Sequence, residues 1–311
     1  MTPWKDTLLG DLFMKTHKEL AGGEEAEAAY EGGVRAEQIR QAALARLGSR
    51  YPAAWLARQV ESWPDQYLLA MSVDRLVTHL EWLARLTDAP ALVDARYDQA
   101  LGTSDYTVYT KDSLTPGIFS KIAGVLAAKG VQILDAQIVT LADGVVVDVF
   151  RVMDPDCLED VRDRRFREIS GAIIGVLEQR YSVEELLQDA TRFGQARQGV
   201  PLREATVVQV DNETSDRYTI IDVFADDRQG LLYVITRAIF DLGLSVHAAR
   251  ISTRLDQVVD VFYVTDKAGG KIANLGGCKL ISEELTSRIE GFLGEAKTPR
   301  QVVHRAGAQR T

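Results

Sequence analysis

The chain has 311 residues, 46% of them hydrophobic and 26% charged, and its formal net charge is −9. This length is enough for two or three domains, each with its own core, and the acidic balance argues against a nucleic-acid-binding surface. No apolar run approaches the length of a membrane span, and the acidic N-terminus lacks the apolar core of a signal peptide. The two cysteines, Cys157 and Cys278, favour a reducing, cytoplasmic location in which both thiols are inert.

The first hundred residues are rich in Ala, Leu, Glu and Arg and are expected to be helical. We expect helices over residues 7–20 and 36–47, with an exposed acidic connection at 24–33 between them. The apolar residues within 73–86 recur every three or four positions, which predicts an amphipathic helix with Ser72 as its N-cap.

The remainder of the chain contains two similar segments. Gly117 in the first corresponds to Gly230 in the second, 113 residues later, and after a one-residue gap Asp148 corresponds to Asp260. A self-match with a single gap indicates a duplicated structural unit.

Each copy is expected to contain a strand, a helix, two further strands and a second helix. For the first copy we expect strands at 106–110, 131–138 and 145–153 and helices at 118–126 and 159–178. For the second copy we expect strands at 218–224, 244–251 and 257–265 and helices at 231–239 and 279–293. A last strand would complete each copy, at 207–210 in the first and at 300–304 in the second.

This β-α-β-β-α-β order is that of a ferredoxin-like unit. The sequence therefore predicts an α+β protein: a helical segment at 1–100, followed by two tandem ferredoxin-like domains at 101–213 and 214–311.

Signatures of catalysis and metal binding are missing from the sequence. The four histidines, at positions 17, 79, 247 and 304, lie far apart, and neither a phosphate-binding loop nor a Gly-x-Ser-x-Gly motif occurs. We therefore expect no catalytic residue, no metal site and no cofactor in this chain. The densest basic cluster, at 162–167, is interrupted by acidic residues and is expected to be a solvated helix face.

The turn between the first strand and the first helix of each copy is the candidate ligand site. In the second copy the turn ends in Asp227-Arg228-Gln229-Gly230-Leu231. Glycine lets a ligand approach the backbone, the helix N-terminus suits a carboxylate, and the neighbouring Asp suits an ammonium group. An amino acid meets both demands, although a tight turn that needs glycine for its geometry alone accounts for the same residues.

Residues 227–232, Asp-Arg-Gln-Gly-Leu-Leu, together with 258–264, Val-Val-Asp-Val-Phe-Tyr-Val, resemble an ACT domain, a small amino-acid-sensing module. The tandem arrangement resembles the C-terminal region of bacterial PII uridylyltransferase/uridylyl-removing enzymes, and the similarity extends upstream to residues 65–69 and His79. In that family an N-terminal nucleotidyltransferase domain and a metal-dependent HD domain carry the catalysis. Neither signature is present in this chain.

The resemblance implies glutamine sensing near the second turn. Asp227 and the backbone at Gly230 and Leu231 would engage the amino-acid head group, and His247 on the adjoining strand would either meet the ligand or pack against a neighbouring ACT unit. The first turn departs from the usual Asp-x-Pro-Gly spacing and is the weaker candidate, with four possible contacts: Asp112, Gly117, Ile118 and Asp135.

The resemblance also implies a role in nitrogen-status signalling, with the PII protein or separate catalytic domains as partners and a homodimer formed through the ACT domains. Two alternatives stay open. The chain could be assigned as a uridylyltransferase whose catalytic domains lie on another chain or are lost. It could also be an ACT scaffold that dimerises and binds no ligand.

Overall fold

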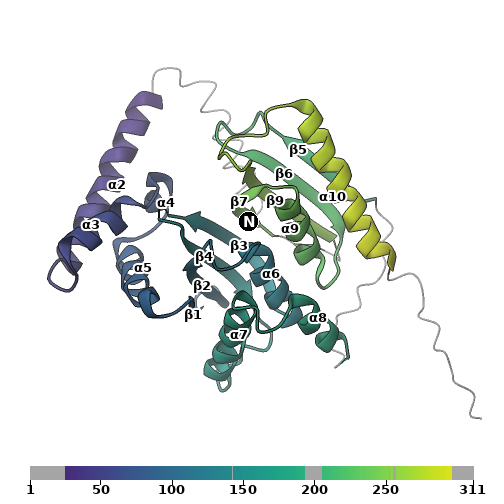
Figure 1. The fold of residues 1–311 in the computed structure, drawn as a ribbon, viewed down its shortest axis with the longest axis horizontal. Helices are drawn as coiled ribbons and strands as arrows, with labels where there is room; N and C mark the ends of the chain where they lie inside the picture. The colour runs from purple at the N-terminus through teal and green to yellow at the C-terminus, as the bar shows by residue number, and fades with distance from the viewer. Residues whose placement is uncertain (1–24, 142, 193–204, 252, 255–256, 296–311) are drawn as a thin grey trace, which may run out of the picture. The chain divides into compact units, whose positions relative to one another are not determined.

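The computed structural model describes residues 25–141, 143–192, 205–251, 253–254 and 257–295 (Figure 1). It divides into two compact units. The first contains the described residues up to Asp94 together with Thr107–Pro116 and Val139–Val149, and the second contains the other described residues. The helix expected at 7–20 and the strand expected at 300–304 lie outside the described residues. Within those residues, no helix is both long and apolar enough to cross a membrane.

The N-terminal segment is helical, as expected. Its helices are α2 (Glu25–Leu47), α3 (Ala53–Glu61), α4 (Asp65–Leu69), α5 (Val73–Arg85) and the short 3-10 helix η1 (Leu86–Asp88). The connection expected at 24–33 is wrong, because α2 already begins at Glu25. Ala and Glu are strong helix formers, and their propensity outweighs the cost of the Gly32-Gly33 pair.

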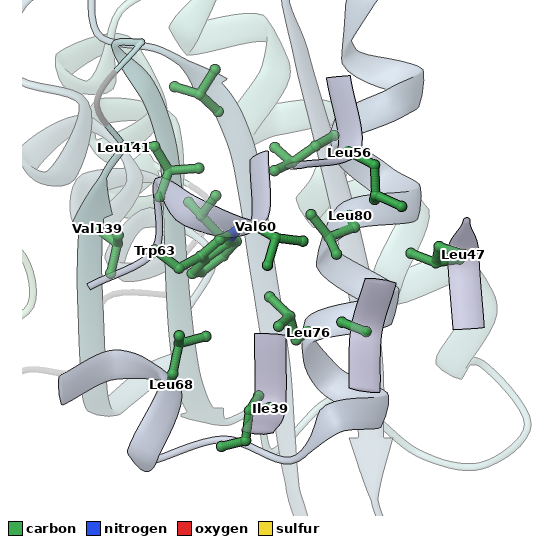
Figure 2. Close-up of a cluster of buried hydrophobic side chains, with 14 of the residues drawn as sticks. Ile39, Leu47, Leu56, Val60, Trp63, Leu68, Leu76, Leu80, Val139 and Leu141 are labelled. Atoms are coloured by element: carbon green, nitrogen blue, oxygen red, sulfur yellow. The ribbon is translucent and has the colours of Figure 1, made fainter. Parts of the chain in front are cut away.

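The helices of the first unit share a buried apolar core with strand residues of the same unit. Figure 2 shows Leu76 and Leu80 of α5 on one side and Val139 and Leu141 on the other, with Trp63, from the connection between α3 and α4, next to the latter two. All five side chains are buried. Burial of this apolar surface is the main force that attaches the helical segment to these strands.

His79 of α5 also belongs to this core and is buried. Its ring stacks on Trp63 with centroids 5.2 Å apart, and its Nδ1 lies 2.8 Å from the hydroxyl oxygen of Tyr109. His79 therefore has a packing role between the helices and a strand of the first unit.

Ser72 is the N-cap of α5, as the sequence predicts: its Oγ accepts a hydrogen bond from the backbone N–H of Arg75 at 3.2 Å. Replacing Ser72 by alanine removes this acceptor, and we expect the free energy of unfolding to fall by about 1 kcal/mol. Chemical denaturation measures the change. Ser72→Asp supplies another capping oxygen and should retain the stability; equal stability of the alanine and aspartate variants would contradict the capping role.

The strands form one antiparallel sheet. They are β1 (Ala91–Asp98), β2 (Thr103–Lys111), β3 (Gln132–Thr140), β4 (Val145–Met153), β5 (Val207–Asp211), β6 (Thr219–Asp226), β7 (Ser245–Arg250), β8 (Thr253–Arg254) and β9 (Gln257–Thr265). Their order is β1-β2-β4-β3-β7-β9-β6-β5, and β8 pairs with β9. The later helices are α6 (Ile118–Ala128), α7 (Arg162–Leu177), α8 (Val183–Arg192), α9 (Leu231–Asp241) and α10 (Leu275–Glu295). The α+β class with two ferredoxin-like units is thus confirmed.

The leading strand of each copy was not expected. β5, predicted to complete the first copy, instead pairs antiparallel with β6 of the second, with Val207 opposite Phe224 and Asp211 opposite Ile220. That part of the prediction is wrong. Similarly β1, within a segment expected to be helical, lies beside β2. The sheet position next to the first strand can be filled from either end of a repeat, and local sequence does not say which.

The same type of turn follows both leading strands, β1 and β5, which indicates that these strands belong to the repeated unit. The Oδ1 of Asp98 accepts hydrogen bonds from the backbone N–H groups two and three residues later, at 2.9 and 3.1 Å. The Oδ1 of Asp211 does the same at 2.6 and 3.0 Å. Asp98 and Asp211 have the same spacing as Gly117 and Gly230. The duplicated unit is therefore β-β-α-β-β-α and includes a strand upstream of residues 101 and 214.

The two copies join within one chain. β3 of the first copy pairs antiparallel with β7 of the second, with Asp135 opposite Arg250 and Ala136 opposite Ala249. The first helices of the two copies, α6 and α9, also pack against each other in the second unit. This pairing places the two ligand-site turns at opposite ends of a shared helix pair.

Candidate functional site

The turn of the second copy leads directly into helix α9. Gly230 is left-handed, with φ 90° and ψ −6°, and is the N-cap of α9. The backbone N–H of Leu231 donates to the carbonyl of Arg228 at 2.9 Å, so this predicted donor already has an internal acceptor. The N–H groups that follow in the first turn of a helix have no intrahelical acceptor and carry a partial positive charge. Asp227, three residues before Gly230 in the chain, is half-buried.

Two side chains tie this turn to other helices. The Arg228 guanidinium lies 4.2 Å from the centre of the Phe292 ring and donates a hydrogen bond to the Phe292 carbonyl in α10. The Nε2 of Gln229 donates to the carbonyl of Ala127 in α6 at 2.8 Å. Gln229 was not among the predicted site residues. Its contact with the first copy lies 102 residues away in the chain.

Apolar side chains cover Gly230. A Cβ atom added at this glycine would lie 3.6 Å from the Phe292 ring and 3.7 Å from a Leu187 methyl group of α8. Leu187 and Phe292 were not among the predicted site residues, since neither carries a sequence signal that points to this turn. A ligand can therefore approach the Gly230 backbone from this side only if Leu187 and Phe292 move.

The turn of the first copy meets the other end of the helix pair. Gly117 is also left-handed, with φ 70° and ψ 40°, and is the N-cap of α6, which begins at the buried Ile118. A Cβ at Gly117 would lie 3.6 Å from the Phe240 ring of α9. Ala127 and Phe240 have the same spacing as Gly117 and Gly230. The two turns therefore contact the opposite helix at equivalent positions.

The other two predicted contacts of the first copy, Asp112 and Asp135, each interact with polar or charged neighbours. In the first unit Asp112 is exposed, its N–H donates to the Gly144 carbonyl at 2.9 Å, and its carboxylate lies beside that glycine. In the second unit Asp135 lies opposite Arg250. Burial raises the pKa of Asp135, while the charges of Arg250 and Arg151 act in the opposite direction. Asp135 thus has cationic neighbours on the sheet.

His247 lies away from the second turn. Its Nε2 is 2.9 Å from the Thr265 hydroxyl oxygen and its ring is 5.1 Å from that of Tyr218, next to the first residue of β6. Burial, with a smaller effect of Arg217, lowers the pKa of His247. Gly230 follows the other end of β6, whose 8 residues span about 24 Å. The structure therefore does not bring His247 together with Gly230.

Within the described ranges, no group of three or more His, Cys, Asp or Glu side chains is arranged to hold a metal ion. The arrangement at the second turn instead offers a helix N-terminus, a nearby carboxylate and an apolar cover. These are the features that a small zwitterion would need.

Part of the chain is similar to a known protein family. Residues 207–293 match a family model described as "ACR9-like, ACT-like domain". This range begins at β5 and ends in α10, so it corresponds to the second copy with its leading strand. The chain therefore contains tandem ferredoxin-like units, and the second of them is similar to an ACT-like domain.

The relatives place the chain more closely. A bifunctional uridylyltransferase/uridylyl-removing enzyme of Rhodospirillum rubrum is 33% identical over 291 residues, which cover 92% of this chain and 30% of the relative. The enzyme of the same name from Gluconobacter oxydans is 32% identical over 273 residues, or 87% of this chain and 28% of the relative. The chain spans less than a third of these relatives. Nearly all of its length is similar to a part of uridylyltransferase/uridylyl-removing enzymes.

Among solved structures, an aspartate kinase from Synechocystis aligns with a TM-score of 0.31 and 18% identity, over 62% of this chain and 27% of that chain. A likeness at this level supports no assignment of ligand or activity.

Proposed function

We propose that the chain is the regulatory, amino-acid-sensing module of a uridylyltransferase/uridylyl-removing system, and that its ligand is glutamine. The observation that carries this proposal is the left-handed Gly230 at the N-terminus of α9, next to Asp227 and at the junction of α6, α8 and α10. The relatives are uridylyltransferase/uridylyl-removing enzymes, and such a module would act in a system of that kind.

The chemistry of the turn suits an amino-acid head group. The N-terminus of α9 favours a carboxylate, because its free N–H groups and the helix dipole are both positive there. The Asp227 carboxylate favours an ammonium group. Since Gln229 contacts the first copy and Arg228 contacts α10, a ligand that shifts this turn also shifts the packing between elements. Such differential binding is the only route by which a ligand can signal.

The partner in this proposal is catalytic: separate nucleotidyltransferase and uridylyl-removing domains, acting on the PII protein. A second candidate, an ACT scaffold that binds no ligand, is favoured by a specific observation. Leu187 and Phe292 already occupy the space over Gly230. Binding measurements separate the two.

Isothermal titration of the full chain with L-glutamine, L-glutamate and the other common amino acids tests the proposal. We expect L-glutamine to bind, and Gly230→Val to weaken that binding at least tenfold, because a branched side chain blocks the backbone and opposes the left-handed φ. Gly269→Val is the matched control: Gly269 has φ 83° but no atom within 4 Å of an added Cβ. The control should bind as the wild type does.

A chain that binds none of the amino acids would leave the scaffold as the function. Equal affinity of the Gly230 and Gly269 variants would move the ligand site away from this turn.

A further inference from the structure

Helix α8 sits in a notch made by a glycine of the first copy. A Cβ added at Gly124 in α6 would overlap the Val183 side chain of α8 and would lie 2.9 Å from the Tyr233 ring of α9. Any residue other than glycine at this position must displace the Val183 side chain of α8, and with it the closest contact between α8 and α6 at this point. The position 113 residues later is occupied by Arg237, so the notch is a feature of the first copy alone.

A charge-assisted hydrogen bond fastens α8 to α9. The hydroxyl of Tyr233 donates to the Glu184 carboxylate at 2.5 Å. Burial and this carboxylate raise the pKa of Tyr233, so the hydroxyl keeps its proton and remains a donor at neutral pH. Leu187, about one helical turn beyond Val183, is the side chain of α8 that covers Gly230, next to Phe292 of α10.

The rest of α8 is built to remain a helix but not to dock strongly. Ser182 and Glu185 form a reciprocal capping box: the Ser182 N–H donates to the Glu185 carboxylate at 2.7 Å, and the Glu185 N–H donates to the Ser182 Oγ at 3.1 Å. Among the described side chains of α8, only Val183 and Ala190 are buried. Such a helix can leave its notch as a unit, at the expense of a small apolar area.

We propose that α8 is a releasable lid over the amino-acid site. In the docked state Leu187 lies beside Phe292 on Gly230 and blocks the ligand; in the undocked state Leu187 leaves the turn and Phe292 alone remains against Gly230. An amino acid at the turn and a docked α8 are then mutually exclusive, so ligand binding is converted into release of α8. This inference rests on the function proposed above.

The lid lowers the apparent affinity for the ligand by the fraction of molecules in which α8 is undocked. Loosening α8 should therefore tighten ligand binding, whereas damage to an ordinary binding site would weaken it. This difference in direction makes the lid testable.

The test uses Gly124→Ala in the full chain, with Gly171→Ala as its matched control. Each change adds one methyl group inside a helix, where alanine is the better helix former. Only the Gly124 methyl meets α8; at Gly171 in α7 nothing lies within 4 Å of an added Cβ. Hydrogen exchange of the α8 amides and calorimetric titration with L-glutamine are the two measurements.

We expect Gly124→Ala to speed hydrogen exchange in α8 and to tighten L-glutamine binding about tenfold, the effect of weakening the docked state by about 1.4 kcal/mol. Gly171→Ala should change neither quantity. In the wild-type chain, saturating L-glutamine should speed exchange in α8. Leu187→Ala removes the covering side chain without displacing the helix and should also tighten binding, while Gln188→Ala, at an exposed neighbour, should not.

Two outcomes overturn the lid, and they differ. If L-glutamine binds and its affinity is unchanged or weaker in both Gly124→Ala and Leu187→Ala, α8 is not a lid, although amino-acid sensing stands. If neither the wild type nor either variant binds any amino acid, the proposed function is overturned and the lid falls with it.

Discussion

We expect the free energy of unfolding of the wild-type protein to fall as the pH rises from about 4 to about 8, because Asp148 is buried. Replacing Asp148 by asparagine should remove most of this fall. Asp148 lies in β4 and is 1% exposed, and neither carboxylate oxygen has a hydrogen bond of normal geometry. Burial raises its pKa to about 8, and the nearby Val139 amide offsets this only in part. An ionised carboxylate at this position is therefore strongly disfavoured in the folded protein.

The direction of the pH effect follows from proton binding. Below the unfolded pKa, near 4, Asp148 is neutral in both states and imposes no penalty. Between that pH and about 8 the unfolded chain loses the proton while the folded chain keeps it, so the free energy of unfolding falls as the pH rises. Above the folded pKa the loss is complete, on the order of 5 kcal/mol.

Urea denaturation of the wild type and Asp148→Asn at pH 5 and pH 9 measures this effect. The asparagine has nearly the same shape and never ionises, so its advantage over the wild type should grow by several kcal/mol between the two pH values. Asp160→Asn, at an exposed position, should follow the wild-type curve. A difference between wild type and Asp148→Asn that does not change with pH would show that Asp148 is ionised in the folded state.

Replacing Arg165 by methionine should lower the free energy of unfolding by about 3–5 kcal/mol, because it leaves the Asp154 carboxylate buried without its partner. The Asp154 side chain is 0% exposed and that of Arg165 is 11% exposed. Their contact is bidentate, with Nε–Oδ2 at 2.8 Å and Nη2–Oδ1 at 3.3 Å. The same Nη2 also donates to the Lys129 carbonyl at 2.6 Å. The pair thus joins α7, the end of β4 and the end of α6.

Arg164→Met is the control for this change. Arg164 is the exposed neighbour in the same helix, and its replacement should alter stability by no more than about 0.5 kcal/mol. The double variant Asp154→Leu, Arg165→Met should recover much of the loss, because no unpaired charge remains. A stability loss equal for Arg165→Met and Arg164→Met would mean that the buried pair contributes little.

The burial of Arg165 in this pair was not predicted from the sequence. The cluster at 162–167 was expected to be a solvated helix face, and Arg164 and Arg167 are indeed exposed. The prediction is wrong for Arg165. Its side chain pairs with Asp154, which lies before the helix at the end of β4. Sequence spacing within a helix identifies a face, but it does not show which residue of that face meets a buried carboxylate from another element.

For the fold, the sequence by itself determined the elements that local physics controls. Strands β4 and β9 have the predicted bounds, because alternation and turn residues act over a few positions. The helices that follow Gly117 and Gly230 begin where the sequence predicts, at Ile118 and Leu231. The duplication, read from the same residues, predicted two units of one kind.

Only the tertiary structure decided which strand pairs with which and what covers the turn. The pairing of β5 with β6, the bond from Gln229 to Ala127, the separation of His247 from Gly230 and the cover of Leu187 over Gly230 are contacts between segments distant in the chain. Such contacts are selected by the burial of surfaces that form only once the elements have assembled. No local pattern of residues encodes them.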